Sequence, residues 1–224
     1  MPVPTVPLFP LRTVLVPGLV LPLHIFEPRY RLMMHTLADA PDDERGFGVV
    51  AVRPGYSEAD GLDGLYQTGT MARITKFDEL PDGRYDVLTV GARRFTIEEL
   101  DDALPYTRAR VRLHGEPVGD EPRTAELAAD AARLLAAYRE VIAGWGVIEM
   151  ADIDHLPHDP VVLSYLVASA IVTDLPERQA LLGIEDAEQR LLAVCKVLRR
   201  EIAVMSAMPS MPAVDLAGSR LWAN

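Results

Sequence analysis

PLFPLRTVLVPGLVLPLHIFEPRYRLMMHTL, residues 7–37, carries the strongest structural signal in this chain. It begins as an extended apolar segment and changes character at Glu27 and Pro28, after which apolar residues recur at helical spacing. A strand that leads directly into a short helix is therefore predicted. Proline has no backbone N–H to donate, so the prolines of this segment confine it to a sheet edge or to a bend around a barrel. Pro17 and Gly18 predict a tight turn within it.

The composition predicts a globular protein without a general affinity for polyanions. The chain has 224 residues, of which 49% are hydrophobic, enough for one large domain or two small ones. Its formal net charge of -11 argues against binding to nucleic acid or to anionic membranes, because both carry charge of the same sign. Prolines and a glycine interrupt the long apolar run before it could span a bilayer.

The cysteine content and the N-terminus both bear on the compartment. Cys195 is the single cysteine of the sequence, which excludes an internal disulfide and a four-cysteine zinc site and fits a reducing cytoplasm. The N-terminus lacks the basic stretch of a signal peptide. We therefore expect a cytoplasmic protein.

The remainder of the first half predicts β-structure. An Asp-Gly pair at 82–83 is typical of a hairpin turn. Residues 106–113 alternate in the manner of a half-buried antiparallel strand, with arginines on one face. Residues 54–64 are rich in glycine and acidic residues without periodicity, so we interpret them as a loop. The predicted strands are residues 46–53, 66–77, 85–90, 94–97 and 106–113.

The second half predicts helices. Residues 115–122, GEPVGDEP, form the clearest linker, with two glycines and two prolines. Asp159 and Pro160 predict the start of a nearly apolar, central helix. Short connections between the helices favour a bundle. The predicted helices are residues 123–143, 160–172, 175–183 and 186–205.

Several motifs, in this order, are similar to those of the N-terminal substrate-binding domain of the Lon protease family. The opening segment carries PLFPLR at 7–12, PG at 17–18 and LPLHIFEPRY at 21–30. TGTMARI at 68–74 resembles the G-T-x-A-x-I strand of the family, and VGARRF at 90–95 resembles its G-x-x-R-F segment. DPVVLSYLVASAIVTDLPERQALLGIEDAEQRLLAVCKVL at 159–198 resembles the helical half of that domain.

The resemblance implies an α+β fold in which a PUA-like β-barrel precedes a helical bundle. We assign residues 1–115 to the barrel and residues 122–208 to the bundle. Residues 209–224 lie outside the resemblance, and their composition predicts a loose C-terminal tail.

Full-length members of the Lon family continue into an ATPase and a serine–lysine peptidase. A phosphate-binding loop requires Gly-Lys-Ser/Thr, whereas Lys76 follows a threonine and Lys196 follows a cysteine. Both lysines lie in segments that predict a strand and an amphipathic helix, and the chain ends before a peptidase domain could begin. We therefore expect a non-catalytic protein with no catalytic residue, no cofactor and no metal.

Two other motifs imitate catalytic or metal sites. GYSEA at 55–59 imitates a nucleophile elbow around Ser57, but its last residue is alanine and a loop replaces the required helix. Residues 152–159, DIDHLPHD, collect two histidines and three carboxylates, which suit either a metal or a solvated loop before a helix. Cys195 lies on an apolar helical stripe, where buried thiols are usually inert.

An RNA-binding module is the alternative function. Arg108, Arg110 and Arg112 share one face of their predicted strand, and PUA-like barrels include RNA binders. Acidic residues at 98, 99, 101 and 102 are placed to neutralise this face across the sheet. The segment also lacks interleaved aromatic residues for base stacking.

His24, Phe26, Tyr30 and Tyr106 are the candidate peptide-binding residues. A proline-rich segment with unpaired backbone beside aromatic side chains is suited to receive an extended peptide. The same side chains would also serve to close the barrel, because large apolar groups are mostly buried, and both interpretations stay open. Our leading hypothesis is a non-catalytic module that binds unfolded or exposed polypeptide segments, as an adaptor that presents them to a cytoplasmic protease.

Overall fold

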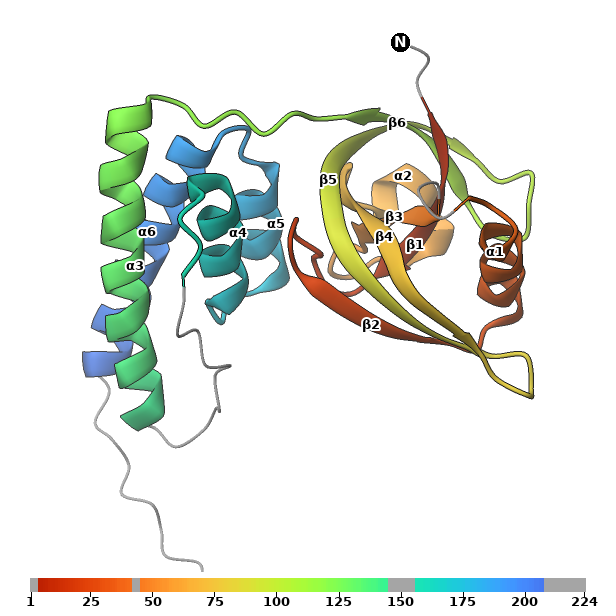
Figure 1. Cartoon of the computed structure of the whole chain (residues 1–224), viewed down its shortest axis with the longest axis horizontal. Coiled ribbons are helices and arrows are strands. Elements are labelled where there is room, and N and C mark those ends of the chain that lie inside the picture. Colours follow the sequence, from red (N-terminus) through yellow and green to blue (C-terminus); the bar gives the residue numbers. More distant parts are fainter. Residues whose placement is uncertain (1–3, 42–44, 145–155, 208–224) are drawn as a thin grey trace, which may run out of the picture.

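The computed structural model describes residues 4–41, 45–144 and 156–207. It has an α+β fold in which a curved sheet and a group of helices lie side by side (Figure 1). The strands are β1 (Thr5–Leu11), β2 (Val20–Ile25), β3 (Gly46–Ala51), β4 (Thr68–Glu79), β5 (Tyr85–Asp101) and β6 (Arg108–Leu113). The helices are α1 (Pro28–Ala38), the short η1 (Glu58–Asp60), α2 (Gly61–Gly64), α3 (Glu121–Gly144), α4 (Pro160–Ala170), α5 (Leu175–Gly183) and α6 (Ala187–Ala207).

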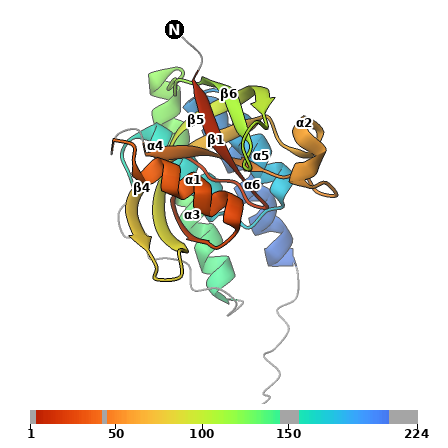
Figure 2. The ribbon, with the colours of Figure 1, turned by 90° about the vertical axis from the view of Figure 1, so that its right-hand side faces the viewer.

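The described strands form one sheet in the order β2-β5-β4-β3-β1-β6. β1 and β3 are parallel, and the other pairs are antiparallel. β5 has different partners at its two ends, because its first half pairs with β2 and its second half with β6. The pairing of β5 with β6 brings the sheet back onto itself, so the strands wrap around a common interior (Figures 1 and 2).

β2 lies at the end of the strand order, which is one of the two placements predicted for the proline-rich segment, whereas β1 of the same segment pairs with both β3 and β6. Among the strands that the structure describes, β2 pairs with β5 alone. Just before β2, the N–H of Gly91 donates to the carbonyl of Leu19 over 2.9 Å. Because bonded pairs alternate in an antiparallel ladder, the backbone of Pro22 faces the open side of β2, where its missing N–H breaks no ladder bond.

Helix α1 covers part of the sheet with the face that the sequence predicts (Figure 2). Proline occupies its first position, where the absent N–H costs no helical bond. The helix packs against Phe9 and Phe47 of the strands in one apolar core. Its buried residues are Tyr30, Met33, Met34 and Leu37, the helical spacing read from the sequence.

Helices α3 to α6 enclose a second apolar core. The carboxylate of Asp159 caps α4 as predicted, because it accepts from the N–H groups of Val161 at 2.8 Å and Val162 at 3.3 Å. Cys195 is fully buried in this core, in agreement with its predicted place on an apolar stripe. Burial raises the pKa of its thiol, which favours the unreactive protonated form.

A buried cluster of charges joins the helices to the sheet. Arg94 of β5 donates from Nε to Oε1 of Glu116 over 2.8 Å, and from Nη1 to the carbonyl of Leu182 over 3.0 Å. Arg190 of α6 donates to the other oxygen of Glu116 over 3.2 Å and to the hydroxyl of Tyr165 over 2.7 Å. Glu116, which lies in the predicted linker, therefore bridges an arginine from each part of the molecule.

Two regions differ in detail from the sequence prediction. Residues 54–64 are not a simple loop, because they contain η1 and α2. β5 is one continuous strand, where the sequence predicts two. The predicted tail at 209–224 lies outside the described residues, as do residues 152–155 of the acidic and histidine motif. Within the described ranges, no helix is long and apolar enough to cross a membrane.

Candidate functional site

The structure separates the predicted peptide-binding residues into two groups. His24 and Phe26 are exposed at the end of β2, with Phe26 62% exposed and the two ring centroids 6.4 Å apart. Tyr30 and Tyr106 are buried, with 5% and 3% exposure, in the core between the sheet and α1. These two rings present no contact surface to a peptide, so only the first pair lies where a partner could touch it.

Tyr30 has a structural role that its burial explains. Its hydroxyl donates to Oε2 of Glu58 over 2.9 Å, which ties α1 to the start of η1. Arg29 pairs with the same carboxylate and lies 4.5 Å from the centre of the Tyr30 ring. Burial, followed by the bond to Glu58, raises the pKa of the Tyr30 hydroxyl, so it stays a neutral donor.

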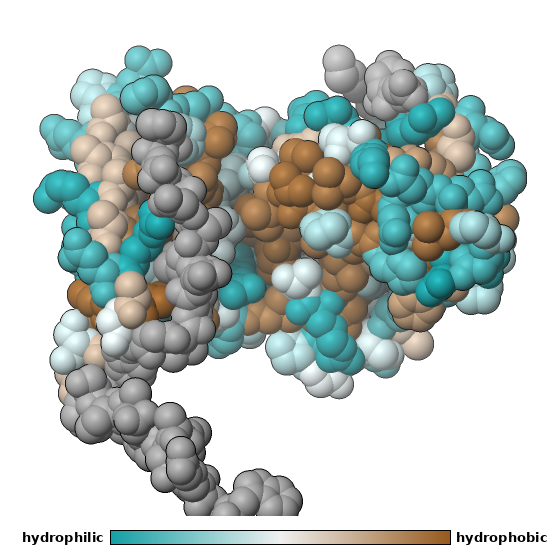
Figure 3. Space-filling model, turned by 60° about the horizontal axis from the view of Figure 1, so that its bottom comes forward, coloured by the Kyte–Doolittle hydropathy of each residue, from teal (hydrophilic) through white to brown (hydrophobic). Residues whose placement is uncertain are grey.

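An uncovered apolar surface follows the outer face of β2 and β5. Val20 is 51% exposed, and Leu88 of β5, which faces Pro22 in the strand register, is 37% exposed. Figure 3, which brings the underside of Figure 1 forward, shows a hydrophobic area in the middle of this face, beside the helices. We call the exposed residues Leu19, Val20, Pro22, Leu88 and Val162 the apolar strip.

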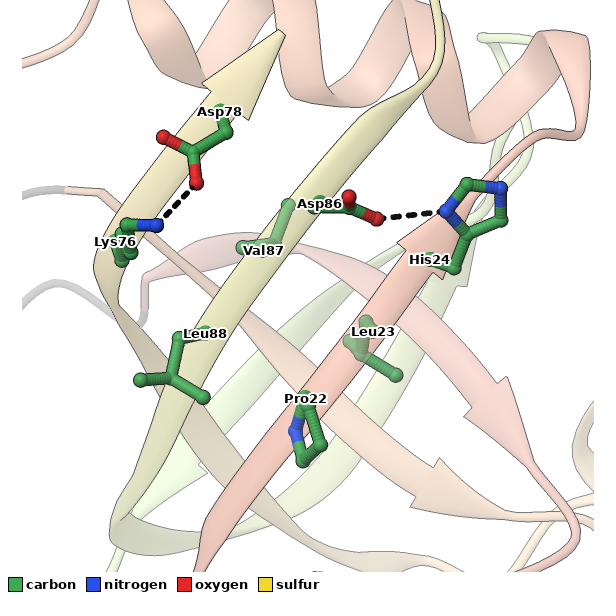
Figure 4. A pocket seen from close by; sticks show the side chains of 8 residues that line it. All are labelled: Pro22, Leu23, His24, Lys76, Asp78, Asp86, Val87 and Leu88. Atoms are coloured by element: carbon green, nitrogen blue, oxygen red, sulfur yellow. Dashed lines mark hydrogen bonds and ion pairs between the residues drawn. The ribbon is translucent and has the colours of Figure 1, made fainter. Parts of the chain in front are cut away.

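A hollow of about 400 Å³ lies over the part of the apolar strip that Pro22 and Leu88 form. Figure 4 shows its side chains, which come from three neighbouring strands. Apolar groups of Pro22 and Leu88 lie at one end and charged groups at the other, where His24 pairs with Asp86 at 2.7 Å and Lys76 with Asp78 at 2.6 Å. The lining residues are Pro22, Leu23, His24, Lys76, Asp78, Asp86, Val87 and Leu88.

A second, smaller hollow of about 90 Å³ lies between the β1–β2 connection and α4. Leu19 belongs to its lining and adjoins Val20, while Val162 and Leu166 line it from the helix. The apolar strip therefore runs from α4 along β2 to the charged end of the 400 Å³ hollow. A strand of six residues is roughly 20 Å long, so the strip suits an extended segment of about that many residues.

The alternating arginines do not form a free cationic face. Arg108 pairs with Asp101 at 2.5 Å, and Arg110 pairs with Glu99 at 2.9 Å. Arg112 lies 3.4 Å from Glu98. Each partner comes from β5, which pairs with β6, so the predicted neutralisation across the sheet is confirmed. This geometry offers no support for the RNA-binding alternative.

The other candidate motifs show no catalytic arrangement in the part of the chain that the structure describes. Ser57 donates from Oγ to Asp60 over 2.9 Å, and its N–H donates to the same carboxylate over 2.8 Å, as in a capping box where the side chain three residues further on bonds back to the first residue. Those bonds lower the pKa of Asp60. No group of three or more potential metal ligands occurs among the described residues.

Sequence reasoning missed most of the apolar strip. The predicted strand at 85–90 alternates between Tyr85, Val87 and Thr89, which are buried, and Asp86, Leu88 and Val90, which are not fully buried. Leu88 and Val90, on the same face as Asp86, were the available signal. A similar signal is Val20, because it shares its face with Pro22 and His24, which are also exposed.

The comparisons with known proteins agree on one class, the substrate-binding domains of ATP-dependent proteases. The family model described as the ATP-dependent protease La (LON) substrate-binding domain matches residues 5–200. The chain therefore belongs to this family.

Curated relatives match along most of this chain but over only part of their own length. Lon protease 2 of Myxococcus xanthus is 31% identical over 203 residues, which cover 89% of this chain and 24% of that protein. Lon protease of Escherichia coli K12 is 26% identical, with 89% of this chain and 25% of that protein covered. The chain thus spans about a quarter of the length of these relatives.

Two solved structures share the fold. The N-terminal domain of Lon protease from Mycobacterium avium complex superposes with a TM-score of 0.62 at 20% identity, covering 89% of this chain and 98% of that one. The Lon N-terminal domain protein from Xanthomonas campestris gives a TM-score of 0.59 at 22% identity, covering 92% and 99%. At these identities the likeness concerns the fold alone.

Proposed function

We propose that this protein binds exposed, extended segments of other polypeptide chains along the apolar strip. The observation that carries the proposal is a row of apolar side chains that the fold leaves uncovered on the outer face of β2 and β5. Membership of a substrate-binding family supports it. His24 and Phe26 contact the bound segment at the end of β2, while Tyr30 and Tyr106 hold that end in place from the core.

Binding of a segment requires complementary shape and apolar contact and involves no chemical reaction. A side chain placed over Leu88 and Pro22 removes apolar surface from water, which contributes roughly 25 cal/mol for each Å². A segment of about six residues buries less area than a standard protein interface, so we expect dissociation constants on the order of micromolar. Weak binding of this kind suits a protein that must also release its clients.

We further propose a non-catalytic adaptor that presents bound segments to a protease in the cytoplasm. The relatives it matches are proteases, and the matched part corresponds to their substrate-binding domain. The sequence itself contains no Gly-Lys-Ser/Thr motif. In this proposal the curved sheet is a PUA-like barrel within residues 1–115, and α3 to α6 form a helical bundle within residues 122–208.

The test measures binding of a permanently unfolded client, such as reduced and carboxymethylated α-lactalbumin, by fluorescence anisotropy. Wild type is compared with a double variant, Val20→Asp with Leu88→Asp, which places charge on the apolar strip. We expect the double variant to lose at least tenfold in affinity, because the client must then desolvate two carboxylates.

The matched control is Leu104→Asp, which changes an exposed leucine outside the strip. Its affinity should equal that of wild type, and circular dichroism should show all variants folded. Equal client binding by wild type and the double variant, or no binding by wild type, would contradict the proposed site.

A further inference from the structure

At the charged end of the 400 Å³ hollow, the aspartates differ in their partners among the residues that the structure describes. Asp78 pairs with Lys76 at 2.6 Å, and Asp82 pairs with Arg84 at 2.7 Å. Asp86 is different, because its ion-pair partner among the described residues is the imidazole of His24, at 2.7 Å. That partner is a cation only when both of its ring nitrogens carry hydrogen.

Both ring nitrogens of His24 have a polar neighbour, and these contacts can be assigned for the neutral imidazole. Nη1 of Arg84 lies 3.1 Å from Nε2 of His24. A guanidinium group can only donate, so Nε2 must accept and carries no hydrogen. Nδ1 then carries the hydrogen and donates it to Asp86. With the imidazole neutral, the pair of His24 and Asp86 has a net charge of -1.

The strand register places a second carboxylate beside this one. Asp78 of β4 is the direct partner of Asp86 of β5. Like charges directly opposite on neighbouring strands repel each other, and a cation between them relieves the repulsion. The ammonium of Lys76 already bonds Asp78, and the repulsion leaves Asp86 as the acceptor for an incoming positive charge.

We propose that the segments bound on the apolar strip carry a lysine or arginine two residues away from an apolar residue, and that the basic side chain pairs with Asp86. This inference rests on the proposed function. An apolar side chain lies over Pro22 and Leu88, and the basic side chain two residues further along the segment, on the same face, reaches the charged end of the hollow (Figure 4). Segments with glutamate or aspartate at that position are disfavoured.

The test uses three labelled nine-residue peptides that differ at one position, two residues from an apolar residue. The position holds lysine, its neutral isostere norleucine, or glutamate. For wild type we expect the lysine peptide to bind about threefold more tightly than the norleucine peptide and about tenfold more tightly than the glutamate peptide. Raising the ionic strength from 0.05 to 0.5 M should reduce these ratios, because the pair is exposed.

Two variants assign the preference to Asp86. Asp86→Asn retains an oxygen that accepts from His24 but removes the charge, so the lysine and norleucine peptides should bind with equal affinity. Asp63→Asn, which changes an exposed aspartate of α2, should keep the wild-type ratios. A lysine preference that persists in Asp86→Asn overturns the assignment.

The peptide set also separates this inference from the function on which it rests. If wild type binds all three peptides equally, the basic preference is wrong while polypeptide binding stands. If none of the three peptides binds, both proposals are wrong.

Discussion

Gly48 in β3 shows how a single absent side chain shapes the interior of the sheet. A Cβ at this position would lie 2.7 Å from the ring of Phe95 and 2.9 Å from the side chain of Leu8, both fully buried. Such distances are too short for carbon atoms, which prefer about 3.5 to 4.0 Å. Glycine therefore provides the space that the Phe95 ring fills.

Gly48→Ala should lower the free energy of unfolding by about 1–3 kcal/mol, because the added methyl overpacks a filled core. Urea denaturation measures the change. The same substitution at Gly115, where a Cβ would meet no neighbour within 4 Å, is the control and should have little effect. Phe95→Leu combined with Gly48→Ala should be less destabilised than the sum of the single changes; strict additivity would contradict the contact.

His114 is a second residue whose surroundings have a measurable consequence. Its Nε2 lies 2.7 Å from the hydroxyl of Thr96. Burial, followed by the charges of Arg94 and Arg112, lowers the pKa of His114 below its usual value of about 6.5. The native state therefore binds a proton less readily than the unfolded state. Stability from this group is complete above pH 6.5 and is lost as the pH falls through the lowered native pKa.

His114→Gln should accordingly reduce the loss of stability between pH 7.5 and 5. We expect the stability of wild type relative to the variant to fall as the pH is lowered across that range. Urea denaturation at several pH values provides the measurement. His35→Gln changes an exposed histidine and serves as control. If the free energy of unfolding of wild type and of His114→Gln depends on pH in the same way, the native structure does not disfavour the protonated imidazole.

At the scale of elements, β2 combines an open backbone edge with an apolar outer face. Such an edge is a template for pairing with another strand, and proline is one of the residues by which natural proteins block it. Pro22 lies in the middle of β2 and turns its backbone to the open side. The strip is thus available to side chains of a client while the edge itself resists pairing.

Pro22→Val should restore an N–H on the open edge and promote association between copies of the chain. The fold should persist, because no ladder bond depends on this position. Sedimentation velocity at increasing concentration should show more self-association than for wild type. Pro54→Val, in an exposed loop, is the control. Identical sedimentation of Pro22→Val and wild type would show that the edge is blocked by something other than this proline.

The sequence predicted most elements because their periodicities are long. The apolar spacing of α1 and the Asp159–Pro160 start of α4 identified those helices correctly. The helical turns η1 and α2 are too short to show a period. The sequence predicts two strands in place of β5. The change of its partner from β2 to β6 depends on the tertiary structure and not on the local sequence pattern.

The candidate site was harder to predict than the fold. Aromatic character suggests contact but does not say whether a ring faces a partner or the core, so Tyr30 and Tyr106 were selected although they are buried. Val20 and Leu88 were passed over because both faces of their strands carry apolar residues. Which face is covered depends on α1 and on the closure of the sheet, and neither is encoded within the strand itself.

At the scale of the whole molecule, Glu116 connects the sheet to the helices. Arg94 and Arg190 are almost fully buried and share its carboxylate. Removing one member of a buried ion pair leaves an uncompensated charge, which is far more costly than replacing the whole group. The two parts therefore depend on the same carboxylate for their stability.

Glu116→Ala should lower the free energy of unfolding by about 3–5 kcal/mol. It should also separate the unfolding of the two parts, so that near-ultraviolet signals from the sheet and far-ultraviolet helical signals no longer coincide. Glu121→Ala, at an exposed position in the first turn of α3, is the control. A single transition of unchanged midpoint in Glu116→Ala would exclude this dependence.

The positions of these three charged residues along the chain also constrain how the domain can diversify. The three residues Arg94, Glu116 and Arg190 lie far apart in the sequence. A genetic crossover anywhere between Arg94 and Arg190 therefore produces a hybrid whose three residues come from two different parents. A hybrid built by exchanging helical halves between relatives would inherit a matched set only if both parents use the same three residues. Recombination at the linker, where the chain looks easiest to cut, therefore separates Arg94 from Arg190 just as any other crossover between them does.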